Sequence, residues 1–161
     1  MFRIEPFRPT DLPAVIAFVA AIQEHERAGV SELKAGSEIG PRYAELLLRT
    51  VAEQNGLILL VKFGERSIGF SCAWVDEDDD MLLREDVRCH AYISDIFVEV
   101  GWRRKGVGRM LLKAIETHMG QRGCRRARVC SKAANLAALK FYEAAGYRPY
   151  EVTFSKPIAQ A

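Results

Sequence analysis

The segment SDIFVEVGWRRKGVGRMLLKAIETHM, Ser94 to Met119, changes character at its middle. It begins with the apolar residues of a buried strand and ends with the apolar spacing of an amphipathic helix. Between the two lies RRKGVG, residues 103–108, in which three cations precede two glycines that are one residue apart. Cations and glycines at a strand-to-helix junction indicate that the backbone approaches an anion there.

The junction has the features of a phosphate site. A helix that starts near Gly106 leaves its first amides without intrahelical acceptors, at the positive end of the helix dipole. Glycines keep a Cβ out of the way of an approaching anion and tolerate positive φ. The neighbouring cations Arg103, Arg104, Lys105 and Arg109 add charge and donors suited to phosphate oxygens. The pattern therefore favours a pyrophosphate, and its alternative is a tight turn with a solvated basic flank.

Two common nucleotide motifs fit this junction poorly. A Walker A loop needs Gly-Lys-Ser/Thr, whereas the chain has Gly108-Arg109-Met110. A Rossmann fingerprint needs a third glycine where the chain has Leu111, and it follows the first strand of its domain rather than a late one. Both nucleotide hypotheses lose support.

Outward from the junction, the chain alternates strand-like and helix-like segments. The apolar spacing predicts strands over 2–8, 57–63, 67–75, 91–100, 126–131 and 150–158, and helices from the caps at 10–11, over 43–54, 106–122 and 135–145. Residues 29–41 and the acidic 76–90 are expected to be irregular. The order predicts an α/β protein with a central mixed sheet flanked by helices.

The bulk composition bounds the class of protein. The chain has 161 residues, which suits one domain over 1–161, and 49% hydrophobic residues suffice for a core. A net charge of +2 does not suggest bulk nucleic-acid binding, and no apolar run approaches the ~20 residues that span a bilayer. The N-terminal segment has no apolar core like that of a secretory signal, and the four cysteines lack zinc-site spacing. We expect a reduced, cytoplasmic protein without a metal.

A second constellation follows the junction in NLAALKFYEAAGY, residues 135–147. Asn135 and Tyr142 are seven residues apart, about two turns at ~3.6 residues per turn, so they share one face of the helix. A polar cap residue and a phenol therefore line one helix edge just downstream of the anion loop. Taken alone, Tyr142 fits better with an ordinary half-buried tyrosine whose hydroxyl reaches water.

Together these segments resemble the GNAT superfamily of acetyl-CoA-dependent N-acetyltransferases. The family's acetyl-CoA motif is a strand, then (Arg/Gln)-x-x-Gly-x-(Gly/Ala), then a helix, and Arg103, Gly106 and Gly108 stand in its key places. The family's next motif is matched by Asn135, by Phe141-Tyr142 and by Gly146-Tyr147. The two motifs cover roughly residues 91–150, while the N-terminal third resembles the family in layout only.

The resemblance implies a fold and a cofactor site. The fold would be a central mixed sheet with a splayed pair of strands and helices on both faces. Acetyl-CoA would be the co-substrate, its pyrophosphate on the amides from Arg104 to Arg109. Its pantetheine arm would add to a strand edge. The implied cofactor-binding residues are Ile96, Phe97, Val98, Arg103, Arg104, Lys105, Gly106, Val107, Gly108, Arg109 and Asn135.

The resemblance also implies catalytic roles. Tyr142 matches the tyrosine that protonates the departing thiolate, and the amide near Val98 would polarise the thioester carbonyl. Many family members carry a Glu base on the strand before the loop, where this chain has Ser94 and Asp95. Adjacent strand residues point to opposite faces unless a bulge intervenes. The base is therefore open between Asp95, a water held by Ser94, and a residue near Glu24–Glu26.

The resulting hypothesis is direct transfer of an acetyl group to an amine, which is either a small molecule or a protein amine. Two rivals are a non-catalytic acyl-CoA sensor on the same fold and a protein that binds ATP or NAD through RRKGVG. If the acidic run DEDDD, residues 76–80, folded over the pocket, it would favour cationic acceptors. Because sheet-edge dimers are common in the family, a homodimer is a further expectation.

Overall fold

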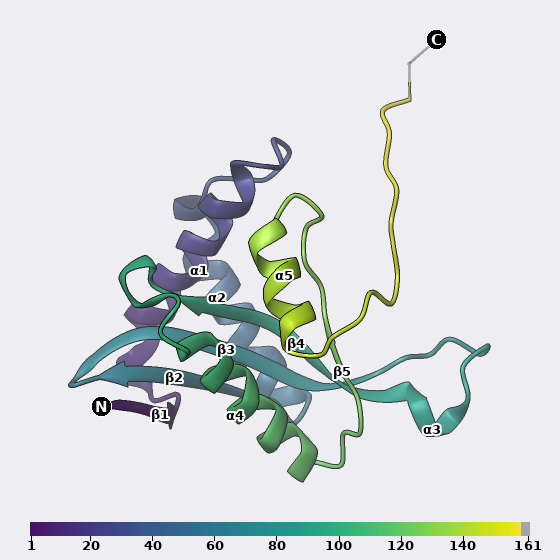
Figure 1. The fold of residues 1–161 in the computed structure, drawn as a ribbon, viewed down its shortest axis with the longest axis horizontal. Helices are drawn as coiled ribbons and strands as arrows, with labels where there is room; N and C mark the ends of the chain where they lie inside the picture. The colour runs from purple at the N-terminus through teal and green to yellow at the C-terminus, as the bar shows by residue number, and fades with distance from the viewer. Residues whose placement is uncertain (159–161) are drawn as a thin grey trace.

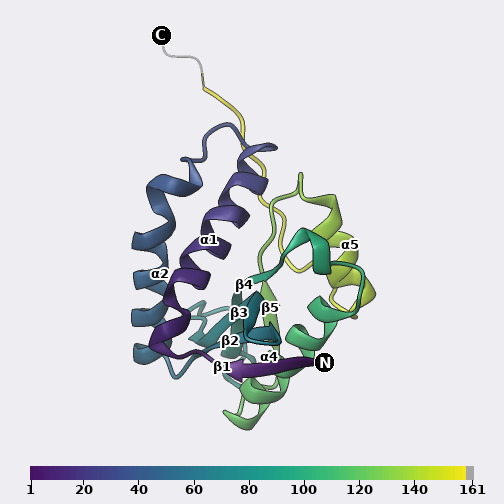
Figure 2. The same ribbon diagram turned by 90° about the vertical axis from the view of Figure 1, so that its left-hand side faces the viewer.

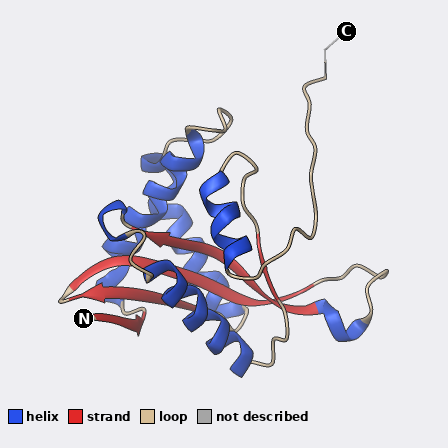
Figure 3. Ribbon diagram, viewed as in Figure 1, coloured by secondary structure: helices blue, strands red, loops and turns tan. Residues whose placement is uncertain are grey.

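The structure, a computed structural model, describes residues 1–158. Five strands form one sheet in the spatial order β1-β2-β3-β4-β5, with helices between and after them along the chain (Figures 1 and 3). The elements in chain order are β1 (Phe2–Pro6), η1 (Pro9–Asp11), α1 (Leu12–Arg27), α2 (Gly36–Glu53), β2 (Leu57–Phe63), β3 (Arg66–Glu77), α3 (Glu85–Arg88), β4 (Cys89–Val98), η2 (Val100–Trp102), α4 (Val107–Gln121), β5 (Ala127–Val129) and α5 (Leu136–Ala144).

The sheet separates two layers of helices (Figure 2). One face packs on α1 and α2 through a cluster that includes Leu60 and Phe70, and the other packs on α4 through a cluster that includes Leu59 and Val61. Consecutive residues of β2 thus enter opposite clusters, which explains why this strand is a continuous apolar run rather than an alternating one. The expected fold class, a mixed sheet with helices on both faces, is confirmed.

The strands β4 and β5 pair only briefly. β4 is antiparallel to β3 over its whole length, but it is parallel to β5 only from Ala91 to Ile93. Beyond Ile93 the two strands separate, and the side of β4 that faces away from β3 is left unpaired over residues 94–98. This is the splayed pair of strands that the resemblance implied, and it opens the sheet next to the anion loop.

A β-bulge lies in β4 at the point where the splay begins. Ile93 is opposite Ala73 and Asp95 is opposite Cys72, so Ser94 is an extra residue in the strand. The extra residue reverses the alternation of the residues that follow. Asp95 consequently faces the layer of α1 and α2, whereas a regular strand would have turned it toward α4.

The N-terminal part of α2 departs from expectation. The sequence predicted a loop to residue 41 and a helix from Tyr43, but the helix begins at Gly36 and includes Pro41. A Cβ on Gly36 would lie 2.2 Å from the carbonyl oxygen of Ala20, and one on Gly40 would lie 3.3 Å from that of Ile16. These two glycines, one helical turn apart, let α2 approach α1 closely. Tertiary packing here outweighs weak helix propensity.

The expected strand over 150–158 is wrong. Residues 148–158 have no regular structure and are all exposed, and they run away from the body of the molecule (Figures 1 and 2). A strand forms only where it pairs through hydrogen bonds with a neighbouring strand, and no strand within residues 1–158 pairs with this segment. The strand over 126–131 is also shorter than expected, because β5 pairs only over residues 127–129.

Candidate active site

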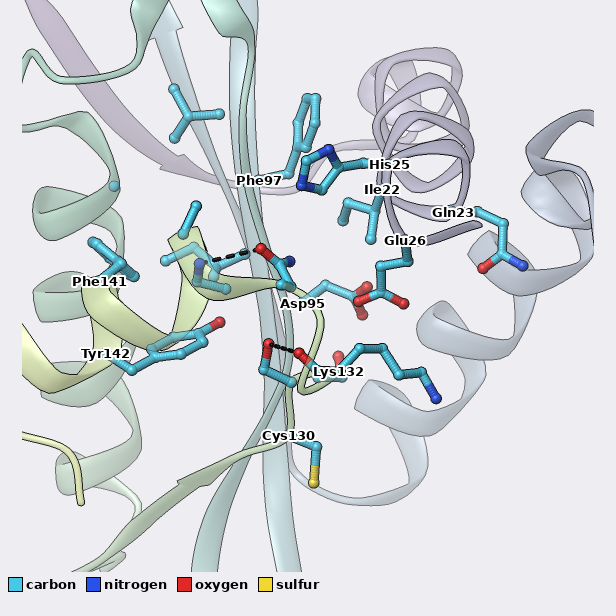
Figure 4. Close-up of a pocket in the computed structure, with 18 of the residues that line it drawn as sticks. Ile22, Gln23, His25, Glu26, Asp95, Phe97, Cys130, Lys132, Phe141 and Tyr142 are labelled. Atoms are coloured by element: carbon cyan, nitrogen blue, oxygen red, sulfur yellow. Dashed lines mark hydrogen bonds between the residues drawn. The ribbon is translucent and has the colours of Figure 1, made fainter. Parts of the chain in front are cut away.

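One cavity of about 1230 Å³ collects most of the residues singled out in the sequence. It lies between the end of α1, the splayed part of β4, the start of α4, and α5 with the segment before it (Figure 4). Residues from both sequence motifs line it, namely Asp95, Ile96, Phe97, Val98, Arg103, Arg104, Gly106, Gly108, Arg109, Asn135 and Tyr142. Segments 40 residues apart in the chain therefore meet at the splay.

The anion loop has the backbone that its glycines suggested. Gly106 is the N-cap of α4 with φ +79°, and Arg104 also has a positive φ, +59°. Gly108 follows in the first turn, where a Cβ would lie 3.4 Å from the ring of Phe141. The amides of this turn lack helical acceptors, so they are available to an anion at the positive end of α4.

Two predicted loop residues do not present their side chains to the cavity. The ammonium of Lys105 lies 4.8 Å from the centre of the Trp102 ring, a cation–π contact outside the cavity. The side chain of Val107 is 1% exposed and belongs to the core under the sheet. These two positions can contribute only backbone amides to the site.

Arg103 occupies part of the open edge of β4, next to the anion loop. The guanidinium of Arg103 donates to the carbonyl of Val98 at 2.8 Å and lies 5.8 Å from the centre of the Phe97 ring. Arg103 thereby ties the loop to the end of β4. The backbone of Ile96 and Phe97 has no strand beside it on the β5 side of the sheet.

Asp95 is a nearly buried carboxyl group that lines the cavity. It is 8% exposed, and its Oδ2 accepts a hydrogen bond from the hydroxyl of Tyr43 at 3.2 Å. Burial raises the pKa of Asp95 to about 6, while hydrogen bonds from Ser94 and Tyr43 oppose the rise and the nearby Glu26 adds to it. A carboxylate with a pKa near neutrality can accept a proton and release it again.

This raised pKa makes the stability of the protein depend on pH. The folded protein keeps the Asp95 proton up to about pH 6, while the unfolded chain loses it near the ordinary pKa of 3.8. The free energy of unfolding is therefore higher below pH 4, and this extra stability is lost as the pH rises through 6.

We expect Asp95→Asn to be more stable than wild type above pH 7, because asparagine carries no charge to bury. The expected difference is up to about 3 kcal/mol, at ~1.36 kcal/mol per pKa unit. Urea titrations at several pH values should show this difference shrink toward pH 4.

Asp11 is a matched control for this measurement. It is also nearly buried, but its Oδ1 is 2.9 Å from the ammonium of Lys62. Although burial raises the pKa of Asp11, the hydrogen bond and charge of Lys62 lower it overall. Asp11→Asn should therefore destabilise the protein at neutral pH. If both variants changed stability in the same direction, the unusual protonation of Asp95 would be contradicted.

Tyr142 lies across the cavity from Asp95, and its hydroxyl points into the open space (Figure 4). Its ring packs 5.3 Å from that of Phe141 and 5.8 Å from that of Tyr147. Burial, and then the negative charges of Asp95 and Glu26, raise the pKa of Tyr142 above its ordinary value. The phenol thus stays protonated at any physiological pH and has a proton to donate.

Asn135 lies at the N-cap of α5. Its Oδ1 accepts a hydrogen bond from the amide of Ala138 at 3.2 Å, so the side chain first serves to start the helix. The amide NH₂ group has both donors left for a ligand, since the cap uses only the oxygen. Asn135 and Tyr142 line the same cavity, as their shared helix face predicted.

The residues at the end of α1 divide into two groups. Glu24 accepts a hydrogen bond from the amide of Gly36 and does not line the cavity, so its carboxylate serves the junction of α1 and α2. His25 and Glu26 both line the cavity.

The acidic run 76–80 and the basic run 122–128 contribute no residue to the lining of the cavity. Asp78 and Arg128 instead form an ion pair with each other away from the site. The acidic run therefore does not fold over the pocket.

Sequence reasoning missed Tyr43, Tyr92, Cys130 and Lys132, which also line the cavity. Tyr43 is 52 residues from Asp95 in the chain and was predicted only as the first residue of the helix over 43–54. No local pattern connects it to the site. Cys130 and Lys132 come directly after β5, between the two sequence motifs. Their place between the motifs was the only feature of the sequence that could have indicated a part in the site.

Two further features of residues 1–158 bear on the site. No group of three or more His, Cys, Asp or Glu side chains in this part of the chain is arranged to hold a metal ion. None of its helices combines the length and the apolar character needed to cross a membrane.

Comparisons with known proteins identify the family and the fold of the chain. The model of the Acetyltransferase (GNAT) family matches residues 15–147. No curated protein sequence matches the chain. Solved structures do resemble it, among them a GCN5-related N-acetyltransferase from Ralstonia eutropha at 19% identity and a TM-score of 0.74, covering 99% of this chain and 100% of that one.

Two more similar structures extend the comparison. The protein BH1408 from Bacillus halodurans aligns at 18% identity and a TM-score of 0.78, covering 97% of this chain and 99% of that one. The aminoglycoside acetyltransferase AAC(6')-Iy, in complex with a bisubstrate analogue of CoA, aligns at 18% identity and a TM-score of 0.71, covering 99% of each chain. At these identities the structures show a shared fold. Because the family model covers most of the sequence, the chain belongs to the GNAT acetyltransferase family.

Proposed function

We propose that this protein transfers the acetyl group of acetyl-CoA directly to a primary amine. Membership of the GNAT family and the fold shared with aminoglycoside acetyltransferases support acetyl transfer. The observation that carries the finer proposal is the single cavity that joins the anion loop at Gly106–Arg109 to Asp95 and Tyr142. A phosphate-binding end and a proton-transfer end in one space are what a CoA thioester and an amine require.

The residues present fit acetyl-CoA. Gly106 and Gly108 keep side chains away from the free amides at the start of α4, and Arg103, Arg104 and Arg109 line the same end of the cavity. The unpaired edge of β4 offers backbone groups to a ligand with amides of its own. One of the similar structures, AAC(6')-Iy, was solved with CoA, which supports the same ligand here. When bound, acetyl-CoA supplies the activated thioester.

At the end of the cavity away from the anion loop, the proposed catalytic groups are Asp95 and Tyr142. Asp95 takes a proton from the acceptor ammonium, since its pKa of about 6 leaves it mostly ionised at neutral pH. Tyr43 holds the carboxylate in position through its hydrogen bond to Oδ2. Tyr142 gives its phenolic proton to the departing thiolate, and the amide near Val98 polarises the thioester carbonyl. No covalent enzyme intermediate is needed.

The wall beyond Asp95 suggests the kind of amine. Ile22, Leu33 and Ile39 line it, with Glu26 as the other carboxylate. Among the described lining residues only Asp95 and Glu26 are acidic, which is little negative charge for a polycation. We therefore propose an acceptor with one primary amine on an apolar body, rather than a polyamine or an aminoglycoside.

A thiol-release assay with a panel of amines tests the function. The panel contains an arylalkylamine, an aliphatic monoamine, spermidine, an aminoglycoside and a lysine peptide. We expect thiol release that depends on the amine, with the highest kcat/KM for the apolar monoamines. Stabilisation by acetyl-CoA without thiol release for any amine would favour the sensor. Stabilisation by ATP or NAD alone would favour a nucleotide-binding protein.

Gly108→Glu should weaken acetyl-CoA binding at least tenfold, about 1.4 kcal/mol. The new carboxylate would stand in the first turn of α4, beside Phe141, where the pyrophosphate has to lie. Gly120→Glu is the matched control, because it adds the same charge to the same helix at an exposed site with no atom within 4 Å of a new Cβ. Calorimetric titration of both variants decides, and equal affinities in folded proteins would contradict the assignment of the loop.

A further inference from the structure

Two cysteines come together at the end of β4 that is farther from the anion loop. Cys89 is the first residue of β4, and Cys124 lies between α4 and β5. β4 runs parallel to β5 with Ala91 opposite Ala127. Two residues earlier, this register sets Cys89 beside Arg125, the neighbour of Cys124. Adjacent strands are about 4.8 Å apart, which is compatible with the ~4.4–6.8 Å between the Cα atoms of a disulfide.

The side chains of both cysteines are on the α4 side of the sheet. Ala91 and Ile93 belong to the core cluster between the sheet and α4, and Cys89 shares their face because side chains alternate along a strand. Cys124 packs against the same cluster. Burial raises the pKa of Cys124, and the thiol of Cys89 raises it further. An effect of one thiol on the other requires the two side chains to be adjacent.

We propose that Cys89 and Cys124 are a site of reversible oxidation, at which a small-molecule disulfide converts the two thiols into an intramolecular disulfide bond. The other two cysteines are placed differently. Cys72 is buried in the core cluster on the opposite side of the sheet, and Cys130 lines the cavity beyond β5. Neither Cys89 nor Cys124 lines the cavity, so this site is separate from the proposed active site.

The different exposure of the two thiols sets the order of the reaction. Cys89 is exposed and meets the reagent first, whereas Cys124 is half-buried. The Cys89 thiolate attacks one sulfur of the small disulfide and releases the other half as a thiol. The Cys124 thiolate then attacks the Cys89 sulfur of this mixed disulfide and releases the second thiol. The two cysteines lose two electrons and two protons, and the reagent gains both.

The bond would close a ring around the segment that carries the anion loop. This ring runs from Cys89 to Cys124 and contains β4, the loop and α4. A cross-link between its two ends restricts the unfolded chain and so stabilises the protein against unfolding. Because the two sulfurs lie outside the cavity, the ring leaves the cavity open. Oxidation should therefore protect the fold rather than block the site.

Mass spectrometry of the full chain tests the site without any measurement of acetyl transfer. The reduced protein is incubated with excess oxidised glutathione, unfolded, alkylated and digested. Two of the four cysteines should escape alkylation, without bound glutathione, and the peptides of Cys89 and Cys124 should be linked. Dithiothreitol should restore all four thiols. A lasting glutathione adduct on Cys89, or a link between two molecules, would overturn the proposal.

Single variants test the assigned order of attack. Cys124→Ser should trap glutathione on Cys89, because no second thiol is left to displace it. Cys89→Ser should acquire neither the adduct at that position nor the bond. Cys130→Ser is the matched control, an exposed cysteine outside the pair, and it should form the bond as wild type does. Loss of the bond in Cys130→Ser, or an unmodified Cys89 in Cys124→Ser, would contradict the pairing.

Urea titrations test the effect of the ring. Oxidised wild type should unfold at a midpoint ~1 M or more above that of the reduced protein, as expected for a disulfide that closes a long loop. In Cys124→Ser the oxidised and reduced samples should have the same midpoint. Because each variant is compared with itself, a change in stability caused by the substitution does not affect the result. Equal midpoints for oxidised and reduced wild type would overturn the stabilising role.

Discussion

Asp95→Asn is expected to lower the rate of acetyl transfer at pH 7 by about a hundredfold or more, within the ~10²–10⁴-fold range of a general base. Asparagine keeps the size of the side chain and can still accept the hydrogen bond of Tyr43. It cannot take the proton of the acceptor ammonium. The loss should shrink at high pH, where more of the amine is already neutral.

The pH dependence of kcat/KM distinguishes a general base at Asp95 from a structural carboxylate. Wild type should show a rise of kcat/KM with an apparent pKa near 6, the pKa to which burial raises Asp95. Asp95→Asn should lack this rise. Glu26→Gln is an informative companion, because removing the nearby negative charge should move the rise to lower pH without abolishing it.

Two outcomes would count against this role. An Asp95→Asn profile with the shape and height of wild type would leave Asp95 as a structural carboxylate. A loss of the acidic rise in Glu26→Gln, with Asp95→Asn near normal, would move the base to the end of α1. Either result leaves the anion loop and the fold untouched, because neither rests on Asp95.

Tyr142→Phe is expected to lower kcat by about ten- to a thousandfold, with little change in acetyl-CoA affinity or melting temperature. The substitution keeps the ring against Phe141 and Tyr147 and removes only the hydroxyl that points into the cavity. A donor that acts on the departing thiolate works mainly in the transition state. Its removal should therefore affect kcat rather than binding.

Tyr147→Phe provides the matched control. Tyr147 packs in the same aromatic cluster, but its hydroxyl donates to Glu116 at 2.7 Å, outside the cavity. Losing this bond should reduce stability by about 1 kcal/mol or less and leave turnover normal. If Tyr142→Phe behaved like Tyr147→Phe, Tyr142 would be a packing residue and the sensor hypothesis would regain weight.

The sequence by itself determined the parts of the site that are local in the chain. Gly106, Gly108 and their flanking cations predicted an anion loop, because a helix start exposes amides wherever it occurs. The spacing of Asn135 and Tyr142 put both on one helix face, and both line the cavity. The order of strands and helices predicted the mixed sheet.

The tertiary structure decided whatever depends on contacts between distant segments. The bulge at Ser94 turned Asp95 toward α2. The sequence of β4 alone does not show this bulge, because it is defined by how β4 pairs with β3. Tyr43 donates a hydrogen bond to Asp95 from a position 52 residues away in the chain, and α2 packs closely on α1 at Gly36 and Gly40, in a segment that was predicted as a loop. The 150–158 segment was predicted as a strand but has no regular structure. Side-chain alternation is a property of the sequence, whereas a hydrogen-bonding neighbour is a property of the fold.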